Sequence, residues 1–126
     1  MNELRVLFMG TPDFAAVILK RLLAWPQGRV VGVITQPDRK AGRGRKMAPP
    51  AVKVLAEEHD LDFLQPETLS NNQSLEFIRN TGADVLTVAA YGLMIPPRIL
   101  TCTPYGALHV HASLLPGYRG AAPIQR

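Results

Sequence analysis

Residues 83–90 read Ala-Asp-Val-Leu-Thr-Val-Ala-Ala, and this stretch decides the fold. Nearly every position is apolar, and β-branched residues recur at alternate sites, which is typical of a strand. Because apolar side chains point to both faces, the strand needs cover on both sides, as helices provide in a parallel sheet. The stretch therefore predicts a central strand of an α/β sheet.

The rest of the chain repeats this alternation of strand and helix. Thr11 is the N-cap candidate of the first helix, with Pro12 at its first position. We expect an α/β fold, a doubly wound, mostly parallel, Rossmann-like sheet with helices on both faces, truncated after its fifth strand. A loop over 112–122 and a helix opening at Pro123 would follow that strand. The expected strands are 4–9, 30–34, 62–64, 83–90 and 106–111, and the expected helical segments are 12–25, 50–59, 71–80 and 97–100.

Length and composition limit the class of protein. The chain has 126 residues, of which 47% are apolar and 19% charged, and this suffices for one globular domain with a core. Its single cysteine, Cys102, cannot form an internal disulfide. No apolar stretch approaches the roughly 20 residues of a membrane-spanning helix. We therefore expect a cytoplasmic protein with no membrane partner.

Positive charge is concentrated in one short segment. The formal net charge is +4, and five of the 14 basic residues lie within residues 39–46, which contain no acidic residue. A cationic, glycine-containing loop indicates contact with a polyanion, for which a nucleic-acid phosphate backbone is the candidate. The alternative is a solvated loop that only keeps the protein soluble. The five residues are Arg39, Lys40, Arg43, Arg45 and Lys46.

Two histidines lie two residues apart in the last expected strand. Side chains at positions i and i+2 of a strand point the same way, so His109 and His111 are expected on one face. Histidine at the carboxyl end of a strand suits proton transfer or stabilisation of an oxyanion. A metal pair, for which no third ligand lies nearby in sequence, and ordinary hydrogen-bonded histidines stay open as alternatives. Gly10 is the one glycine where a dinucleotide fingerprint needs three, which disfavours NAD.

Four motifs carry a resemblance to a known family. They are MGTPDFA at 9–15, TQPDR with AGRG at 35–44, AYGLMIP at 90–96 and HASLLPGYRGAAPIQR at 111–126. Together they make the whole chain similar to the amino-terminal part of the methionyl-tRNA formyltransferases, a branch of the folate-dependent formyltransferases. The SLLP loop is shared by the wider superfamily, whereas the first two motifs point to the tRNA-modifying branch.

The resemblance implies a reaction in translation initiation. A formyl group would pass from 10-formyltetrahydrofolate, the co-substrate, to the α-amino group of methionine on initiator tRNA, without a metal. The family pattern Asn-x-His-x-Ser places His111 on the catalytic histidine and Ser113 on the loop serine. His109 stands where the family has its catalytic asparagine, which donates a hydrogen bond to the oxyanion.

The same resemblance assigns the ligand contacts. Arg43 falls on the arginine that the family places near the acceptor end of the tRNA, so Arg39, Lys40, Arg45 and Lys46 would bind tRNA with it. The residues that would bind folate are Tyr91, Gly92, Leu93, Met94, Ile95, Ser113, Leu114, Leu115 and Pro116.

The resemblance also implies that residues 1–126 form an incomplete amino-terminal formyltransferase domain of a monomeric parent enzyme. An aspartate that orients the catalytic histidine and a carboxy-terminal tRNA-binding barrel would be absent, so we expect little activity from the chain alone. Two alternatives stay open. One is a formyltransferase for a small amine or sugar amine, which has no need of the cationic segment, and the other is a non-catalytic RNA- or folate-binding fragment.

Overall fold

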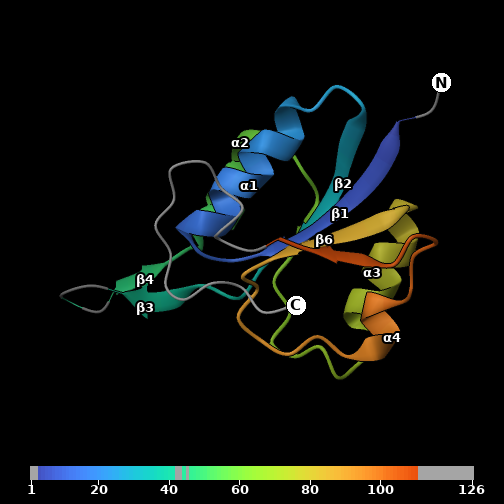
Figure 1. Ribbon diagram of the computed structural model, residues 1–126. Coiled ribbons are helices and arrows are strands. Elements are labelled where there is room, and N and C mark those ends of the chain that lie inside the picture. The colour runs from blue at the N-terminus through green and yellow to red at the C-terminus, as the bar shows by residue number, and fades with distance from the viewer. Residues whose placement is uncertain (1–2, 42–43, 45, 111–126) are drawn as a thin grey trace, which may run out of the picture.

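The computed structural model describes residues 3–41, 44 and 46–110, and its centre is a parallel sheet (Figure 1). The strands lie in the order β5-β2-β1-β6-β7, and every neighbouring pair runs parallel. This arrangement confirms the predicted α/β sheet. The strands are β1 (Leu4–Gly10), β2 (Gly28–Ile34), β5 (Phe63–Leu64), β6 (Val85–Ala89) and β7 (Ala107–His109).

Helices cover both faces of this sheet. The helices α1 (Asp13–Ala24) and α2 (Ala51–Glu58) lie on one face, and α3 (Gln73–Thr81) and α4 (Pro97–Leu100) lie on the other (Figure 1). All four were expected at these places in the chain, and the doubly wound arrangement is therefore confirmed.

The start of α1 differs from the prediction. Pro12 is the N-cap, and no side chain caps the helix. The hydroxyl of Thr11, the expected cap, instead donates to the carbonyl oxygen of Tyr91 at 2.7 Å. The pairing of β1 with β6 brings this carbonyl alongside Thr11, and tertiary structure therefore overrides the local capping preference.

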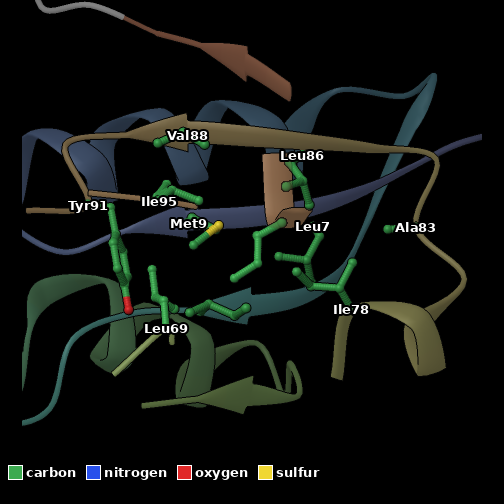
Figure 2. Close-up of a cluster of buried hydrophobic side chains, with 11 residues drawn as sticks. Leu7, Met9, Leu69, Ile78, Ala83, Leu86, Val88, Tyr91 and Ile95 are labelled. Carbon is green, nitrogen blue, oxygen red and sulfur yellow. The ribbon is translucent and has the colours of Figure 1, made fainter. Parts of the chain in front are cut away.

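The alternation of side chains along the central strands divides the core into two clusters. On β1, Leu7 and Met9 pack toward α3 and α4, whereas Phe8 packs toward α1 and α2. All three side chains are completely buried. Figure 2 shows the first cluster, in which the strand side chains meet Leu69 and Ile78. Apolar cover on both faces explains why the central strands are nearly continuous hydrophobic runs.

The strand order creates a topological switch between β1 and β6. From β1 the chain proceeds to β2 and β5 on one side, and it then returns to β6 on the other side of β1. In open parallel sheets, the loops that follow two such strands diverge and leave a crevice at the carboxyl edge. The loops after β1 and β6 therefore flank the place where a ligand is expected.

The cationic segment forms a β-hairpin, where the sequence predicted a loop. Its strands β3 (Arg39–Ala41) and β4 (Lys46–Ala48) pair antiparallel, with Lys40 opposite Met47. The hairpin extends from the main body near the start of α1 (Figure 1). Backbone pairing at its base gives the cations a regular spacing that a free loop would not provide.

Candidate functional site

The carboxyl ends of the parallel strands bring four loops to one edge of the sheet. Thr11 follows β1, Gln36 follows β2, Gln65 follows β5 and Tyr91 follows β6. The carbonyl oxygen of Tyr91 accepts hydrogen bonds from Thr11 Oγ1 and Gln36 Nε2, both at 2.7 Å. The carbonyl oxygen of Gln36 in turn accepts from Gln65 Nε2 at 3.1 Å. The loops thus form one connected surface at the edge where a ligand is expected.

The segment 91–95, predicted to bind folate, is fixed at both ends and open in the middle. Tyr91 and Ile95 are buried in the cluster that Figure 2 shows. Residues 92–94 between them are exposed, and Met94 is 92% exposed. Within the part of the chain that the structure describes, no backbone hydrogen bond uses their peptide groups. Unused N–H and C=O groups on an anchored backbone suit recognition of the polar edge of a heterocycle.

Gly92 lets this segment approach the end of β2. Its φ is +102°, a conformation that disfavours any side chain. A Cβ at this position would lie 2.1 Å from Gln36 Nε2. The glycine therefore serves a close contact between two loops in addition to the ligand contact predicted for it.

The ring of Tyr91 anchors the segment. The residue is 2% exposed, and its Oη has no hydrogen-bond partner among the described residues. Burial raises the pKa of Tyr91 to about 12. The phenol is therefore neutral at physiological pH and packs as an apolar group, and the folate contact predicted for Tyr91 would be made by its backbone N–H, because its carbonyl oxygen already accepts two hydrogen bonds.

The hairpin carries positive charge on both of its faces. Its register places Arg39 and Lys46 on one face and Lys40 on the other, and all three residues are exposed. Arg43 and Arg45, the other predicted RNA contacts, lie outside the described residues. Exposed cations on a projecting ribbon favour contact with an anionic surface such as an RNA backbone.

Three polar contacts hold the base of the hairpin to the body. The guanidinium of Arg39 donates to Gln36 Oε1. Asp38 Oδ1 accepts from Gln65 Nε2 at 2.7 Å and pairs with Lys53 Nζ at 3.2 Å. The hydrogen bond from Gln65, with help from the Lys53 ammonium, holds the pKa of Asp38 below its usual value. The base of the hairpin is therefore held by Gln36, by Gln65 directly after β5 and by Lys53 in α2.

The sequence did not identify Gln36, Asp38 and Gln65 as functional. Each is a polar residue that follows a strand of the parallel sheet within a few positions, and this position in the sequence was the available signal. Their partners were harder to find, because the acceptor of Gln36 Nε2 is a backbone atom of Tyr91, 55 positions away.

A small cavity lies between the hairpin base and the turn after β1. Its volume is about 180 Å³, and it is lined by residues 11–12, 37, 39 and 48–51. Sites for drug-sized ligands occupy about 300–1,000 Å³, so this cavity holds one end of such a ligand at most. Two larger hollows, of about 330 Å³ each, lie at the opposite edge, beside Arg5 and Tyr105. Ligand sites of open parallel sheets lie at the carboxyl edge, so the smaller cavity is the relevant one.

His109 is the one predicted catalytic residue within the described part of the chain. It ends β7 opposite Val88 and is exposed. Its side chain shares a face with Ala107, which packs against the core cluster that contains Tyr91 and Ile95. The pairing continues to Val110, whose N–H donates to the carbonyl of Val88 at 2.8 Å. The other predicted catalytic and folate residues lie outside the described residues: His111, Ser113, Leu114, Leu115 and Pro116.

Among the residues in 3–41, 44 and 46–110, no three His, Cys, Asp or Glu side chains gather closely enough to hold a metal ion. No helix in this part of the chain has the length and apolar character needed to cross a membrane.

Comparison with known sequences places the chain beside formyltransferases. Residues 4–126 match the family described as formyl transferase. Relatives named methionyl-tRNA formyltransferase are 57% identical in Nitratidesulfovibrio vulgaris strain Hildenborough, 50% in Thermotoga sp. strain RQ2 and 51% in Dehalococcoides mccartyi strain CBDB1. Each match covers 98% of this chain, but 37% of the first relative and 39% of the other two. The chain thus spans less than half the length of these relatives.

Solved structures share the fold. Glycinamide ribonucleotide transformylase 1 from Geobacillus kaustophilus superimposes with a TM-score of 0.63 at 17% identity, over 94% of this chain and 63% of that one. Phosphoribosylglycinamide formyltransferase from Bacillus halodurans superimposes with a TM-score of 0.60 at 16% identity, over 90% and 58%. At such identities the likeness concerns the fold alone.

Proposed function

The chain belongs to the formyl transferase family, and we propose that the protein of which it forms part formylates methionine esterified to initiator tRNA. The observation that carries the proposal is the 57% identity to a relative named methionyl-tRNA formyltransferase, over 98% of this chain. That match includes both the cationic hairpin and the segment 91–95. The reaction belongs to translation initiation, and we propose the cytoplasm as its compartment.

The proposed formyl donor is 10-formyltetrahydrofolate, held by the segment 91–95. The exposed peptide groups of residues 92–94 fit the polar edge of a pterin ring, and the two buried anchors keep them in place. By the resemblance, the loop Ser113 to Pro116 completes the folate site. When bound, the donor supplies the formyl carbon and a leaving nitrogen.

The proposed chemistry is acyl transfer between two nitrogens. The α-amino nitrogen attacks the formyl carbon, a C–N bond forms, and the formyl oxygen becomes an oxyanion. The bond from the formyl carbon to N10 of the folate then breaks, and N10 takes the proton that the amine loses. His111 would move this proton, and His109 and Ser113 would stabilise the oxyanion. The exposed place of His109 at the carboxyl end of β7 is compatible with this role.

The proposed acceptor is bound through the hairpin. Arg39, Lys40 and Lys46 are exposed there, and Arg43 and Arg45 complete the cationic set by sequence. Their charge supports an RNA substrate over a small amine or sugar amine, because a small acceptor has no phosphate backbone for a cationic hairpin to bind. Initiator tRNA and folate are therefore the proposed partners of a monomeric enzyme.

The test uses a hybrid protein in which residues 1–126 replace the matching part of the relative from Nitratidesulfovibrio vulgaris. We expect the hybrid to formylate methionyl initiator tRNA. His111→Ala should lower kcat by about 10² or more, as loss of a general acid-base group does. His109→Asn should raise kcat, by up to about 10² to 10³ if the histidine is a poor substitute for an oxyanion donor.

Tetrahydrofolate binding provides the control for both variants. Its affinity should stay within a few fold, because neither change is expected to alter the segment 91–95. If His111→Ala abolishes folate binding and leaves turnover of the bound complex intact, the residue binds substrate and the proposed catalytic role is wrong.

A further inference from the structure

We propose that Gln36 is a positioning residue that couples the hairpin to the segment 91–95, so that RNA on the hairpin tightens folate binding. The inference rests on the proposed function, because it takes the hairpin as the RNA site and the segment as the folate site. It adds an energetic link between the two sites, carried by one side-chain amide.

The side-chain amide of Gln36 makes hydrogen bonds through both its oxygen and its nitrogen. Its Oε1 accepts from the guanidinium of Arg39, the first residue of β3. Its Nε2 donates to the carbonyl oxygen of Tyr91 at 2.7 Å. A primary amide has a donor and an acceptor on the same rigid plane, so the position of one contact constrains the other. The hairpin base and the segment 91–95 are therefore joined by one planar group.

The surroundings leave the amide little freedom. Gln36 is 8% exposed, and its own carbonyl is held by Gln65 at 3.1 Å. Gly92 lies so close to Nε2 that a Cβ would collide with it. A movement of Arg39 is therefore passed to the backbone next to the exposed peptide groups and is not absorbed by rotation of the glutamine.

The backbone that receives this contact depends on it. Tyr91 lies between two residues with positive φ, Ala90 at +53° and Gly92 at +102°. A backbone with positive φ persists only where surrounding contacts hold it in place. Here the side chains of Thr11 and Gln36 hold it, because both donate hydrogen bonds to the carbonyl oxygen of Tyr91. Loss of either donor should loosen the segment.

The direction of coupling follows from ordering. The guanidinium of Arg39 has five N–H donors, so it can bind an RNA phosphate and keep its contact with Gln36. A bound phosphate restricts Arg39, which in turn restricts the amide and the segment 91–95. The folate then binds a backbone that is already ordered, and it binds more tightly.

The test measures the dissociation constant of tetrahydrofolate on the hybrid protein, with and without saturating uncharged initiator tRNA. Both probes are free of the formyl group, so no turnover occurs. For the unmodified hybrid we expect tRNA to tighten tetrahydrofolate binding by about fivefold or more. Gln36→Glu, which keeps an acceptor for Arg39 but loses the donor to Tyr91, should reduce this factor to near one. Arg39→Met, at an exposed residue, removes the hydrogen bond to Gln36 Oε1 at the other end of the link. It should also reduce the factor to near one.

Thr11→Val is the matched control. It removes the other 2.7 Å donor from the same carbonyl, and the hydrogen bond that it removes does not involve a hairpin residue. It should weaken tetrahydrofolate binding and leave the factor unchanged, which a purely structural role of Gln36 would not predict. If the hybrid binds both ligands with a factor of one, or if Arg39→Met keeps the full factor, the coupling is wrong and the proposed function stands. If the hybrid binds neither ligand, the proposed function fails, and the coupling fails with it.

Discussion

Gly92 combines a backbone conformation and a close contact that both exclude a side chain. Its φ is +102°, and a Cβ would lie 2.1 Å from Gln36 Nε2. Gly92→Ala should therefore lower the free energy of unfolding by about 2–4 kcal/mol, from backbone strain and overpacking together. Urea denaturation of the hybrid protein, followed by circular dichroism, measures this loss.

Gly106→Ala separates the two causes. Gly106 has a φ of +72°, but the nearest atom to a Cβ there lies at 3.8 Å, so only strain is added. This variant should lower the free energy of unfolding by about 1 kcal/mol. Equal losses for the two variants would show that the contact between Gly92 and Gln36 is not tight.

Tyr91 carries a buried hydroxyl without a partner among the described residues. An unsatisfied buried polar group costs about 1–3 kcal/mol, so Tyr91→Phe should leave the free energy of unfolding unchanged or raise it by about 1 kcal/mol.

Burial raises the pKa of Tyr91 from 10.0 to about 12. The folded protein releases this proton at a higher pH than the unfolded chain does. The free energy of unfolding therefore keeps its full value below about pH 10 and falls as the pH rises toward 12.

The alkaline part of this prediction is measured by thermal unfolding between roughly pH 9 and 11. Tyr91→Phe should lose less stability over this range than the unmodified hybrid. Tyr105→Phe is the control, because Tyr105 is 73% exposed, and it should behave as the unmodified protein does. If both tyrosine variants show the same pH dependence, Tyr91 is not shielded from water.

Single residues show where sequence reasoning reaches its limit. Gly92 and Tyr91 were predicted as parts of a folate segment because a motif contains them, and their local roles as close contact and anchor became visible only in three dimensions. Thr11 was predicted as a helix cap, since capping is a local rule. Its actual acceptor is the Tyr91 carbonyl, 80 positions away, and no local rule finds such a partner.

Among the elements, those with strong hydrophobic periodicity were predicted best. The stretch 83–90 contains β6, Val85–Ala89, and its two apolar faces pack into separate clusters as expected. The hairpin was predicted only as a cationic loop. Its strands, Arg-Lys-Ala and Lys-Met-Ala, contain no β-branched or aromatic residue, and no Asn-Gly turn joins them. Only the pairing within the folded chain identifies them.

The hairpin charges predict a salt effect on tRNA binding. Replacing Arg43, Arg45 and Lys46 with alanine removes the three phosphate contacts proposed for these residues, so the slope of log K against log salt should shrink by about 2–3. Titration of the hybrid with initiator tRNA at several salt concentrations measures the slope. The matched control replaces Lys20, Arg21 and Arg29, three exposed cations outside the hairpin. If the control reduces the slope as much as the hairpin variant does, the hairpin is not the RNA contact.

For the whole molecule, alternation of strands and helices was sufficient to predict a doubly wound sheet. The strand order β5-β2-β1-β6-β7 then explains why the informative residues occur in loops after strands, since those loops meet at one edge. The catalytic residues were predicted from motifs. Among the described residues, the one that lies at this edge is His109, the last residue of β7. The energetic links across the edge could not be predicted, because they join residues far apart in sequence.

The central claim is that this edge transfers formyl groups to methionine on initiator tRNA. It is tested most directly by kcat/KM of the hybrid protein for methionyl initiator tRNA and for methionine methyl ester, with 10-formyltetrahydrofolate as donor. The account predicts a preference for the tRNA of about 10² or more, and replacing Arg43, Arg45 and Lys46 with alanine should reduce it. Equal kcat/KM values for the two acceptors, or a tRNA preference that survives loss of the hairpin charges undiminished, would contradict it.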